Sequence, residues 1–117
     1  MAGLSTHVLD TSKGKPAAEL KIKLYKIQNS ERVLIKTVST NEDGRVDEPL
    51  LYENNLEVAH YELLFFAGDY LKKHNKNLKQ IFLDKIPIQF FVSNKSEHYH
   101  VPLLLSPFGY STYRGSW

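Results

Sequence analysis

The chain contains no cysteine among its 117 residues. Disulfides, thiolate metal sites and a cysteine nucleophile are therefore excluded. The absence of disulfides is consistent with a reducing compartment. The sequence also lacks an apolar run of membrane-spanning length, and no charged stretch followed by an apolar one opens it. We therefore expect neither a spanning helix nor a signal peptide.

The chain also lacks an excess of charge of either sign, because 15 basic residues are interleaved with 13 acidic ones and the formal net charge is +2. Nucleic-acid-binding proteins usually carry a basic run or stripe, and this chain has none. The length fits one domain, residues 1–117, which at this size buries roughly two thirds of its unfolded surface. We expect a cytoplasmic domain with no nucleic-acid or membrane partner.

What the sequence does contain is period-two alternation of apolar and polar residues, which predicts half-buried β-strands. Residues 20–24 (LKIKL) alternate in this way, and residues 61–66 (YELLFF) form the more continuous apolar run of a central strand. One short helix is predicted over 68–75 (GDYLKKHN), with Asp69 available to cap it. Further strands are predicted over residues 4–9, 32–37, 86–92 and 108–114. This pattern predicts an antiparallel β-sandwich.

Two histidines are predicted to share one face of a sheet. Residues 97–105 (EHYHVPLLL) alternate so that His98 and His100 point away from the core. The opposite, apolar face is formed by Tyr99, Val101, Leu103 and Leu105. In residues 4–9 (LSTHVL), His7 lies opposite the apolar positions. His7 and His100 can therefore both look out from one sheet face, where neutral imidazole is able to take or give a proton.

Each histidine also has a plainer interpretation as a surface residue, and His60 and His74 keep it because nothing polar is organised around them. His98 and His100 could alternatively be two metal ligands, with a third from His7, Asp or Glu. No spacing specific to zinc accompanies the pair.

A cation and several hydroxyl groups complete the candidate set. Arg45 follows the turn 41–44 (NEDG), a place from which loops often present functional groups, and its guanidinium suits planar oxygen patterns. Residues 111–116 (STYRGS) carry four hydroxyls and a second cation. The leucine-rich strand before them, with Phe108 and Tyr110, indicates that this tail is anchored rather than frayed.

Four segments together resemble a known family. The sequences LSTHVLDTSKGKPA, EDGRV, GDYLKKHN and HYHVPLLLSPFGYSTYRGS, which span residues 4–116, are similar to the 5-hydroxyisourate hydrolases, the transthyretin-related proteins. The YRGS tetrapeptide is the most specific of these, since it marks the enzymes and true transthyretins lack it.

The resemblance implies an all-β, transthyretin-like (prealbumin-like) antiparallel β-sandwich of two four-stranded sheets with one short helix. It also implies hydrolysis of 5-hydroxyisourate, the product of urate oxidation, to 2-oxo-4-hydroxy-4-carboxy-5-ureidoimidazoline. No metal or organic cofactor is expected. The implied assembly is a homotetramer, a dimer of dimers, with active sites at the dimer–dimer interface.

The family's functional residues match single positions here. His7 of STHVLD and His100 of HYHVPL match its two catalytic histidines, and Arg45 of DGR matches its arginine. Tyr113 and Ser116 match the tyrosine and serine of YRGS. We expect the histidines to activate water and transfer protons, Arg45 to hold substrate oxygens, Tyr113 to bind the ring and Ser116 to orient the water or a histidine. Which histidine is the general base stays open.

Two other functions remain open at this point. A transthyretin-type carrier would hold an aromatic ligand in a central channel but has no need of YRGS or paired imidazoles. A purely structural sandwich leaves the polar residues unexplained. Trp117 follows the YRGS serine and either crowds the channel or is a benign extension. The final GSW is not a peroxisomal tripeptide, although the peroxisome is the expected site in a eukaryote.

Overall fold

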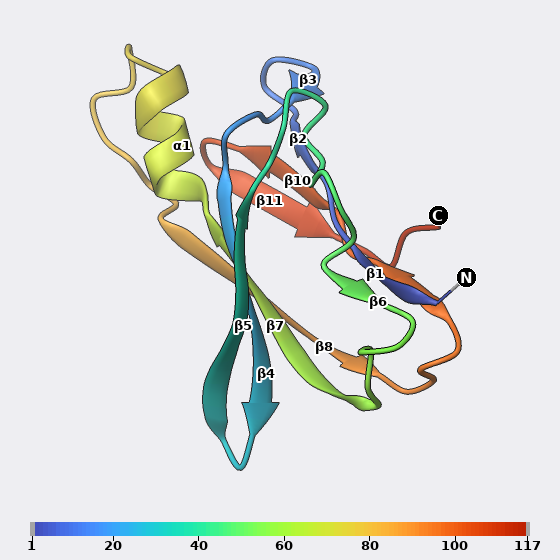
Figure 1. Ribbon diagram of the computed structural model, residues 1–117. Helices are drawn as coiled ribbons and strands as arrows, with labels where there is room; N and C mark the ends of the chain where they lie inside the picture. Colours follow the sequence, from blue (N-terminus) through green and yellow to red (C-terminus); the bar gives the residue numbers. More distant parts are fainter. Residues whose placement is uncertain (1, 117) are drawn as a thin grey trace.

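The computed structural model describes residues 2–116, which fold into two β-layers with one helix at an end (Figure 1). The expectation for Trp117 lies outside the described residues. In chain order the elements are β1 (Gly3–Ser5), β2 (Val8–Asp10), β3 (Lys15–Pro16), β4 (Lys21–Gln28), β5 (Glu31–Ser39), β6 (Leu51–Tyr52), β7 (Ala59–Phe66), α1 (Ala67–His74), β8 (Lys85–Val92), β9 (His98–His100), β10 (Leu103–Ser106) and β11 (Gly109–Thr112).

The first layer is a fully antiparallel sheet in the order β5-β4-β7-β8. Alternation places one side of each strand against the other layer, so that Leu24 and Leu63 pair and are both buried. Pro87 lies on the edge strand β8, where a missing N–H is tolerated. The buried apolar residues of β4, β7 and β8 form one side of the core.

The second layer contains two sheets, β6-β1-β9 and β11-β10-β2-β3, which follow one another along the same stretches of chain. The strand predicted over residues 4–9 is interrupted at Thr6 and His7, so that it forms β1 and β2. The ladder nevertheless continues across the interruption, because Val101 N–H donates to the carbonyl of Ser5 (2.9 Å) and Leu103 N–H to that of His7 (2.9 Å). Pro102, which has no N–H, explains the break between β9 and β10.

The predicted β-sandwich with one short helix is confirmed, but it is not purely antiparallel. β1 pairs with β9 in parallel, and β2 pairs with β10 in parallel. Strands so distant in sequence are not joined by a hairpin, and therefore nothing forces the antiparallel direction. The last strand, β11, is also shorter than the predicted 108–114.

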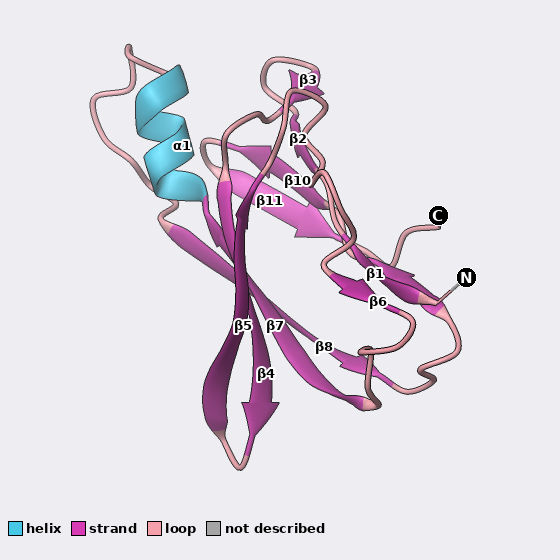
Figure 2. Ribbon diagram, viewed as in Figure 1, coloured by secondary structure: helices cyan, strands magenta, loops and turns pink. Residues whose placement is uncertain are grey.

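The helix is confirmed within one residue at each end, but the predicted cap is wrong. Phe66 occupies the N-cap position without a side-chain hydrogen bond, and Asp69 lies in the first turn. The reason is that β7 runs directly into α1, which leaves no loop residue to serve as a cap (Figure 2). With eight residues, α1, the helix found in the described part of the chain, is too short to cross a membrane.

Strand β5 is more exposed than its alternation predicts. Val33, Leu34 and Ile35 are each at least 40% exposed. Figure 1 gives the reason, since the β4–β5 hairpin extends beyond the second layer and has no partner face there.

A buried carboxylate joins the second layer to the helix. Asp10 is fully buried, and its Oδ2 accepts a hydrogen bond from the Tyr70 hydroxyl of α1 (2.7 Å). Its Oδ1 accepts from the hydroxyl (2.7 Å) and the backbone N–H (3.1 Å) of Ser12. Burial raises the pKa of Asp10, but the hydrogen bonds from Ser12 and Tyr70 outweigh it and hold the pKa below its usual value.

Replacing Asp10 by alanine is expected to lower the free energy of unfolding by about 2–3 kcal/mol, because buried donors lose their acceptor. Tyr70→Phe is the matched control and is expected to cost less, since the carboxylate keeps the Ser12 donors. Urea denaturation monitored by circular dichroism measures both. An Asp10→Ala variant as stable as the wild type contradicts this role.

Candidate active site

Two histidines from distant parts of the sequence form a hydrogen-bonded pair. His7 Nδ1 lies 2.7 Å from His100 Nε2, and the rings stack with centroids 4.8 Å apart and planes inclined by 26°. The parallel register causes this, because Ser5 pairs with His100 and His7 lies two residues further on the same face. The prediction that His7 and His100 share a sheet face is confirmed.

Ser5 extends the pair to a third histidine. Its Oγ lies 2.7 Å from His100 Nδ1 and 2.7 Å from His98 Nε2. Four side chains, from His98 through Ser5 and His100 to His7, therefore form one continuous hydrogen-bonded series. The alternation of residues 97–105 predicted that His98 and His100 share one face, but it did not indicate a role for Ser5. The available signal was that Ser5 precedes His7 by two residues, as His98 precedes His100.

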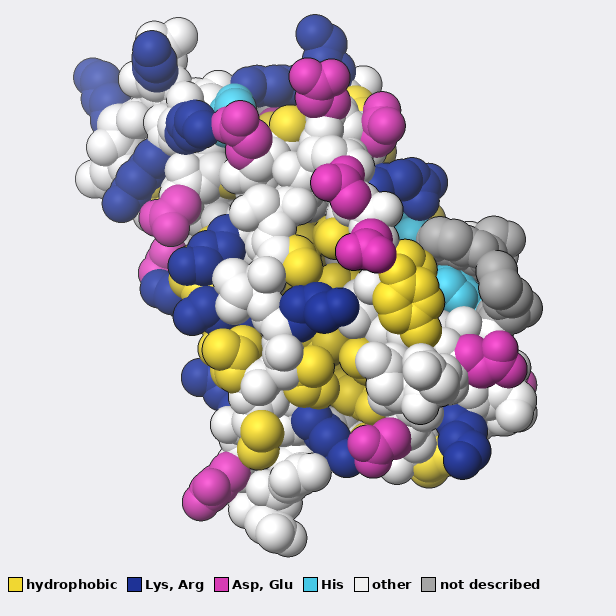
Figure 3. Space-filling view, in the orientation of Figure 1, with side chains coloured by type: hydrophobic (Ala, Val, Ile, Leu, Met, Phe, Trp, Pro, Cys, Tyr) yellow, Lys and Arg dark blue, Asp and Glu magenta, His cyan; other side chains and the backbone are white. Residues whose placement is uncertain are grey.

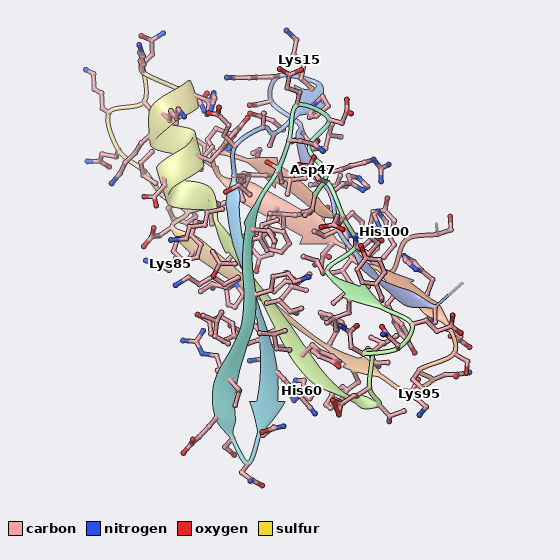
Figure 4. The ribbon with its side chains drawn as sticks, viewed as in Figure 1. Lys15, Asp47, His60, Lys85, Lys95 and His100 are labelled. Carbon is pink, nitrogen blue, oxygen red and sulfur yellow. The ribbon has the colours of Figure 1, made fainter. Side chains whose placement is uncertain are left out.

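The three rings favour their neutral forms. His100 is only 3% exposed, and burial, followed by the nearby His7 and Arg45, lowers its pKa from 6.5 to about 4. Burial and the charge of Arg45 lower the pKa of His7, and burial followed by the charge of the N-terminus lowers that of His98. The imidazoles are therefore uncharged at neutral pH and can accept a proton. In Figure 4 the labelled His100 lies where β1 passes close to the C-terminal segment.

The turn before Arg45 brings this residue beside His7. Asn41 Oδ1 accepts hydrogen bonds from the N–H groups of Asp43 (2.8 Å) and Arg45 (3.2 Å). Gly44 has φ +71°, and a Cβ there would lie 2.4 Å from the Val8 carbonyl. A β-bridge then joins Arg45 to His7. The turn residues thus explain the position of the cation.

Arg45 is exposed and lines a hollow of about 220 Å³ together with Ser5 and Thr6. Asp47 and Glu48 line the same hollow, so its electrostatic character is mixed. Figure 3 shows histidine side chains at the surface on the side of the molecule where β1 and β6 lie. A small planar molecule with several oxygens fits this combination of a fixed cation and neutral imidazoles.

The C-terminal segment packs against His100. Gly115 N–H donates to the His100 carbonyl (2.7 Å), and a Cβ on Gly115 would lie 2.8 Å from His100 Cδ2. Only glycine therefore fits at this position of YRGS. Ser116 follows directly and is exposed. Arg114 anchors the segment, since its guanidinium donates to Glu97 Oε1 (2.9 Å) and lies over a tyrosine ring.

Tyr113 lies at the edge of this cluster, because a Cβ on Gly115 would be 3.5 Å from its Cε2. It is 53% exposed and lines a different hollow, of about 350 Å³, with Phe90 and Tyr99. The fold thus brings together His7, His100, Arg45 and the backbone at 115–116, and Tyr113 lies beside this backbone while lining a different hollow.

The geometry also bears on the metal-ligand interpretation and on the two histidines outside the cluster. Over residues 2–116, no three His, Asp or Glu side chains are grouped to hold a metal ion. His98 and His100 instead share Ser5. His60 stacks on Phe91 and His74 on Tyr70, both outside the cluster.

The two-layer sandwich is the fold of solved transthyretin and 5-hydroxyisourate hydrolase structures. A family model described as the HIUase/Transthyretin family matches residues 4–115, and the chain belongs to this family. It is 53% identical to 5-hydroxyisourate hydrolase 2 of Rhizobium meliloti over 97% of this chain and 95% of that protein. It is 54% identical to 5-hydroxyisourate hydrolase of Mesorhizobium japonicum over 97% and 91% of the two chains.

Solved structures agree with the fold. The structure of Klebsiella pneumoniae 5-hydroxyisourate hydrolase matches with a TM-score of 0.80 and 30% identity, over 98% of this chain and 100% of that one. Sea bream transthyretin in complex with thyroxine matches with a TM-score of 0.87 over 99% and 97%, but at 24% identity it shows the fold alone. (S)-allantoin synthase matches at 42% identity and a TM-score of 0.88 over 98% of this chain, which spans 44% of that protein's length.

The low pKa of His100 predicts that the fold is destabilised by acid. The unfolded imidazole binds a proton near pH 6.5, whereas the folded one does so only near pH 4. The unfolded state therefore holds more protons in this window, and the free energy of unfolding falls as the pH drops from 6.5 toward 4. The contribution of His100 is on the order of 3 kcal/mol over the whole window, of which about 2 kcal/mol is lost by pH 5.0. Denaturant unfolding at pH 7.5, 6.5 and 5.0 measures it, and His100→Gln is expected to flatten the dependence. An equally steep dependence in that variant contradicts the assignment.

Proposed function

We propose that this chain is an enzyme that hydrolyses 5-hydroxyisourate to 2-oxo-4-hydroxy-4-carboxy-5-ureidoimidazoline in urate catabolism. The observation that carries the proposal is the 2.7 Å hydrogen bond between His7 and His100 next to Arg45. The 5-hydroxyisourate hydrolases that match this chain over 97% of its length support the choice of substrate.

Hydrolysis of a cyclic acyl–nitrogen bond needs an activated water, stabilisation of the developing oxyanion and a proton for the leaving nitrogen. His7 is the better placed general base. It is partly exposed, and its Nε2 makes no hydrogen bond within residues 2–116. His100 is buried and already uses both ring nitrogens. His7 therefore takes a proton from water at Nε2. His100 holds the His7 ring in place through its hydrogen bond with His7 Nδ1.

Arg45 supplies the electrophilic part of the site. Its guanidinium holds the oxygens of the substrate and offsets the negative charge that develops on the attacked carbonyl. Its charge also opposes protonation of His7. Burial is the larger cause of the lowered pKa of His7, and the charge of Arg45 lowers this pKa further. His7 is thus kept in the basic form before the reaction begins. Ser116, adjacent to the residue that packs on His100, orients the attacking water.

Tyr113 is assigned to binding of the substrate ring. Within one chain, Tyr113 and Arg45 line different hollows. An assembly in which two chains contribute to one site allows both residues to contact the same substrate. We infer a homotetramer, a dimer of dimers, with sites at the dimer–dimer interface, as the family resemblance implies. Sedimentation equilibrium is expected to give four times the mass of the chain, and a monomer at micromolar concentration contradicts this assembly.

The whole chain, residues 1–117, acts as a single hydrolase domain in this proposal, and the cytoplasmic location stays a prediction. The carrier function has less support, because the thyroxine-bound relative shares only the fold. A carrier also makes no use of neutral paired imidazoles.

The test of the proposed function is the decay of freshly generated 5-hydroxyisourate, followed by ultraviolet absorbance against the spontaneous rate. The wild type is expected to accelerate the decay. His7→Asn is expected to lower kcat by about 10²-fold or more, because general base catalysis is lost. Arg45→Lys and His100→Asn are also expected to be strongly impaired, since a lysine lacks the planar fork and His7 loses its partner.

His60→Asn is the matched control, because His60 stacks on Phe91 outside the cluster and is expected to keep wild-type activity. Circular dichroism verifies that each variant is folded. A wild-type rate equal to that of buffer favours the carrier or structural function. Wild-type rates in all three site variants contradict the residue roles.

A further inference from the structure

We propose that Ser5 and His98 are positioning residues that set the tautomer of His7 and hold its proton during turnover. This inference rests on the proposed function, which it extends beyond the His7–His100 pair. The observation that carries it is the unbroken series of 2.7 Å contacts from His98 Nε2 through Ser5 Oγ and His100 to His7 Nδ1.

The hydrogen-bond inventory of the series allows two arrangements. A serine hydroxyl has one proton to donate, and a neutral imidazole has one donor and one acceptor nitrogen. When Ser5 donates to His98 Nε2, His100 Nδ1–H donates to Ser5, and His7 Nδ1–H donates to His100 Nε2. His7 Nε2 is then unprotonated and able to act as a base. In the reverse arrangement every proton shifts by one position, and His7 Nε2 carries the proton.

Ser5 therefore determines which nitrogen of His7 faces the substrate. Ser5 is only 6% exposed. Bulk water therefore does not take the place of its hydroxyl when the hydroxyl is removed. The basic arrangement also requires an acceptor beyond Ser5, and His98 Nε2 supplies it. Ser5 borders the hollow of Arg45, but its hydroxyl is engaged by His98 and His100, and therefore both residues act through His100 and His7.

The same series moves a proton during the reaction. His7 Nε2 takes a proton from water as the water oxygen bonds to the carbonyl carbon. His7 Nδ1–H then passes to His100 Nε2, His100 Nδ1–H to Ser5 Oγ, and the hydroxyl proton to His98 Nε2. Each intermediate group gains one proton and loses one, so that a single positive charge moves from His7 to His98.

The return shift completes the cycle. As the carbon–nitrogen bond breaks, His7 Nε2–H protonates the leaving nitrogen, and the protons of the series shift back to restore His7 Nδ1–H. One proton of water ends on the leaving nitrogen, and the other leaves when the product carboxylic acid ionises. No further reactant is needed.

The surroundings of the two ends favour this direction. Arg45 faces His7 and His100, and its positive charge opposes a charged imidazole there. His98 instead lines a separate hollow of about 330 Å³ that also includes Glu53. The guanidinium of Arg114 donates to the His98 carbonyl and is neutralised by its bond to Glu97. The positive N-terminus also opposes a charge on His98, but His98 is partly exposed and borders Glu53. By contrast, His100 is only 3% exposed and lies beside Arg45.

Ser5→Ala tests the tautomer, with Ser5→Thr as the matched control that keeps a hydroxyl. The first measurement is ¹⁵N NMR of histidine-labelled protein without substrate. The wild type is expected to populate the Nδ1–H form of His7. Ser5→Ala is expected to shift His7 to the Nε2–H form, because His100 Nδ1 loses its buried partner and is best left unprotonated. Ser5→Thr is expected to restore the wild-type spectrum.

The second measurement is the steady-state rate. Ser5→Ala is expected to lower kcat at least about tenfold, with KM changed less than about twofold, since the general base is lost rather than a binding contact. His98→Gln keeps a hydrogen-bond partner for Ser5 but holds no proton. It is expected to retain the wild-type His7 tautomer and to lose kcat.

These outcomes separate the proposal from the proposed function. If the wild type fails to hydrolyse 5-hydroxyisourate, the function is wrong, and the NMR measurement still decides the role of Ser5. An unchanged His7 tautomer in folded Ser5→Ala contradicts the positioning role. Wild-type kcat in His98→Gln contradicts the proton-holding role, and this variant at a partly exposed position remains informative if Ser5→Ala does not fold.

Discussion

The parallel pairing of the first strand segments with β9 and β10 is the constraint on which the site depends. Ser5 and His100 are 95 residues apart in sequence, yet the β1–β9 register sets them opposite each other. The same ladder continues past Thr6 and Val101, and it places His7 within hydrogen-bond distance of His100. A shift of one residue in this register would turn the histidines to the other face of the sheet. The core therefore fixes the chemistry, because the same alternation that buries Leu4 and Val8 orients Ser5 and His7.

Burial of the imidazoles is the second feature that determines the chemistry of the site. A lone histidine on a surface titrates near pH 6.5, whereas His100 is enclosed by β1, the His7 ring and the backbone of Gly115. Removal from water and the charge of Arg45 act in the same direction and keep the rings neutral. The C-terminal segment is therefore more than a source of polar side chains. Its glycine permits the close contact that excludes solvent from His100.

Period-two patterning predicted the sandwich and strands such as β7 and β8 closely, and the short helix was also predicted within one residue at each end, because these signals are local. The local signals failed where the fold joins elements directly. Asp69 does not cap α1, since β7 enters the helix without a loop, and β5 is exposed because no second layer covers it. The parallel strand pairs were not predicted, since strand direction depends on the path of the chain between them.

By itself the sequence determined which side chains were available and which faces they shared. It excluded cysteine chemistry, and it placed His98 with His100 and Ser5 with His7 on alternate positions of two strands. Only the tertiary structure decided that these strands are neighbours, that Ser5 connects two histidines, and that Tyr113 lies by a different hollow. The physical reason is that alternation is fixed by the geometry of each strand. The distance between two strands, and the loss of water between their side chains, arise only when the layers pack.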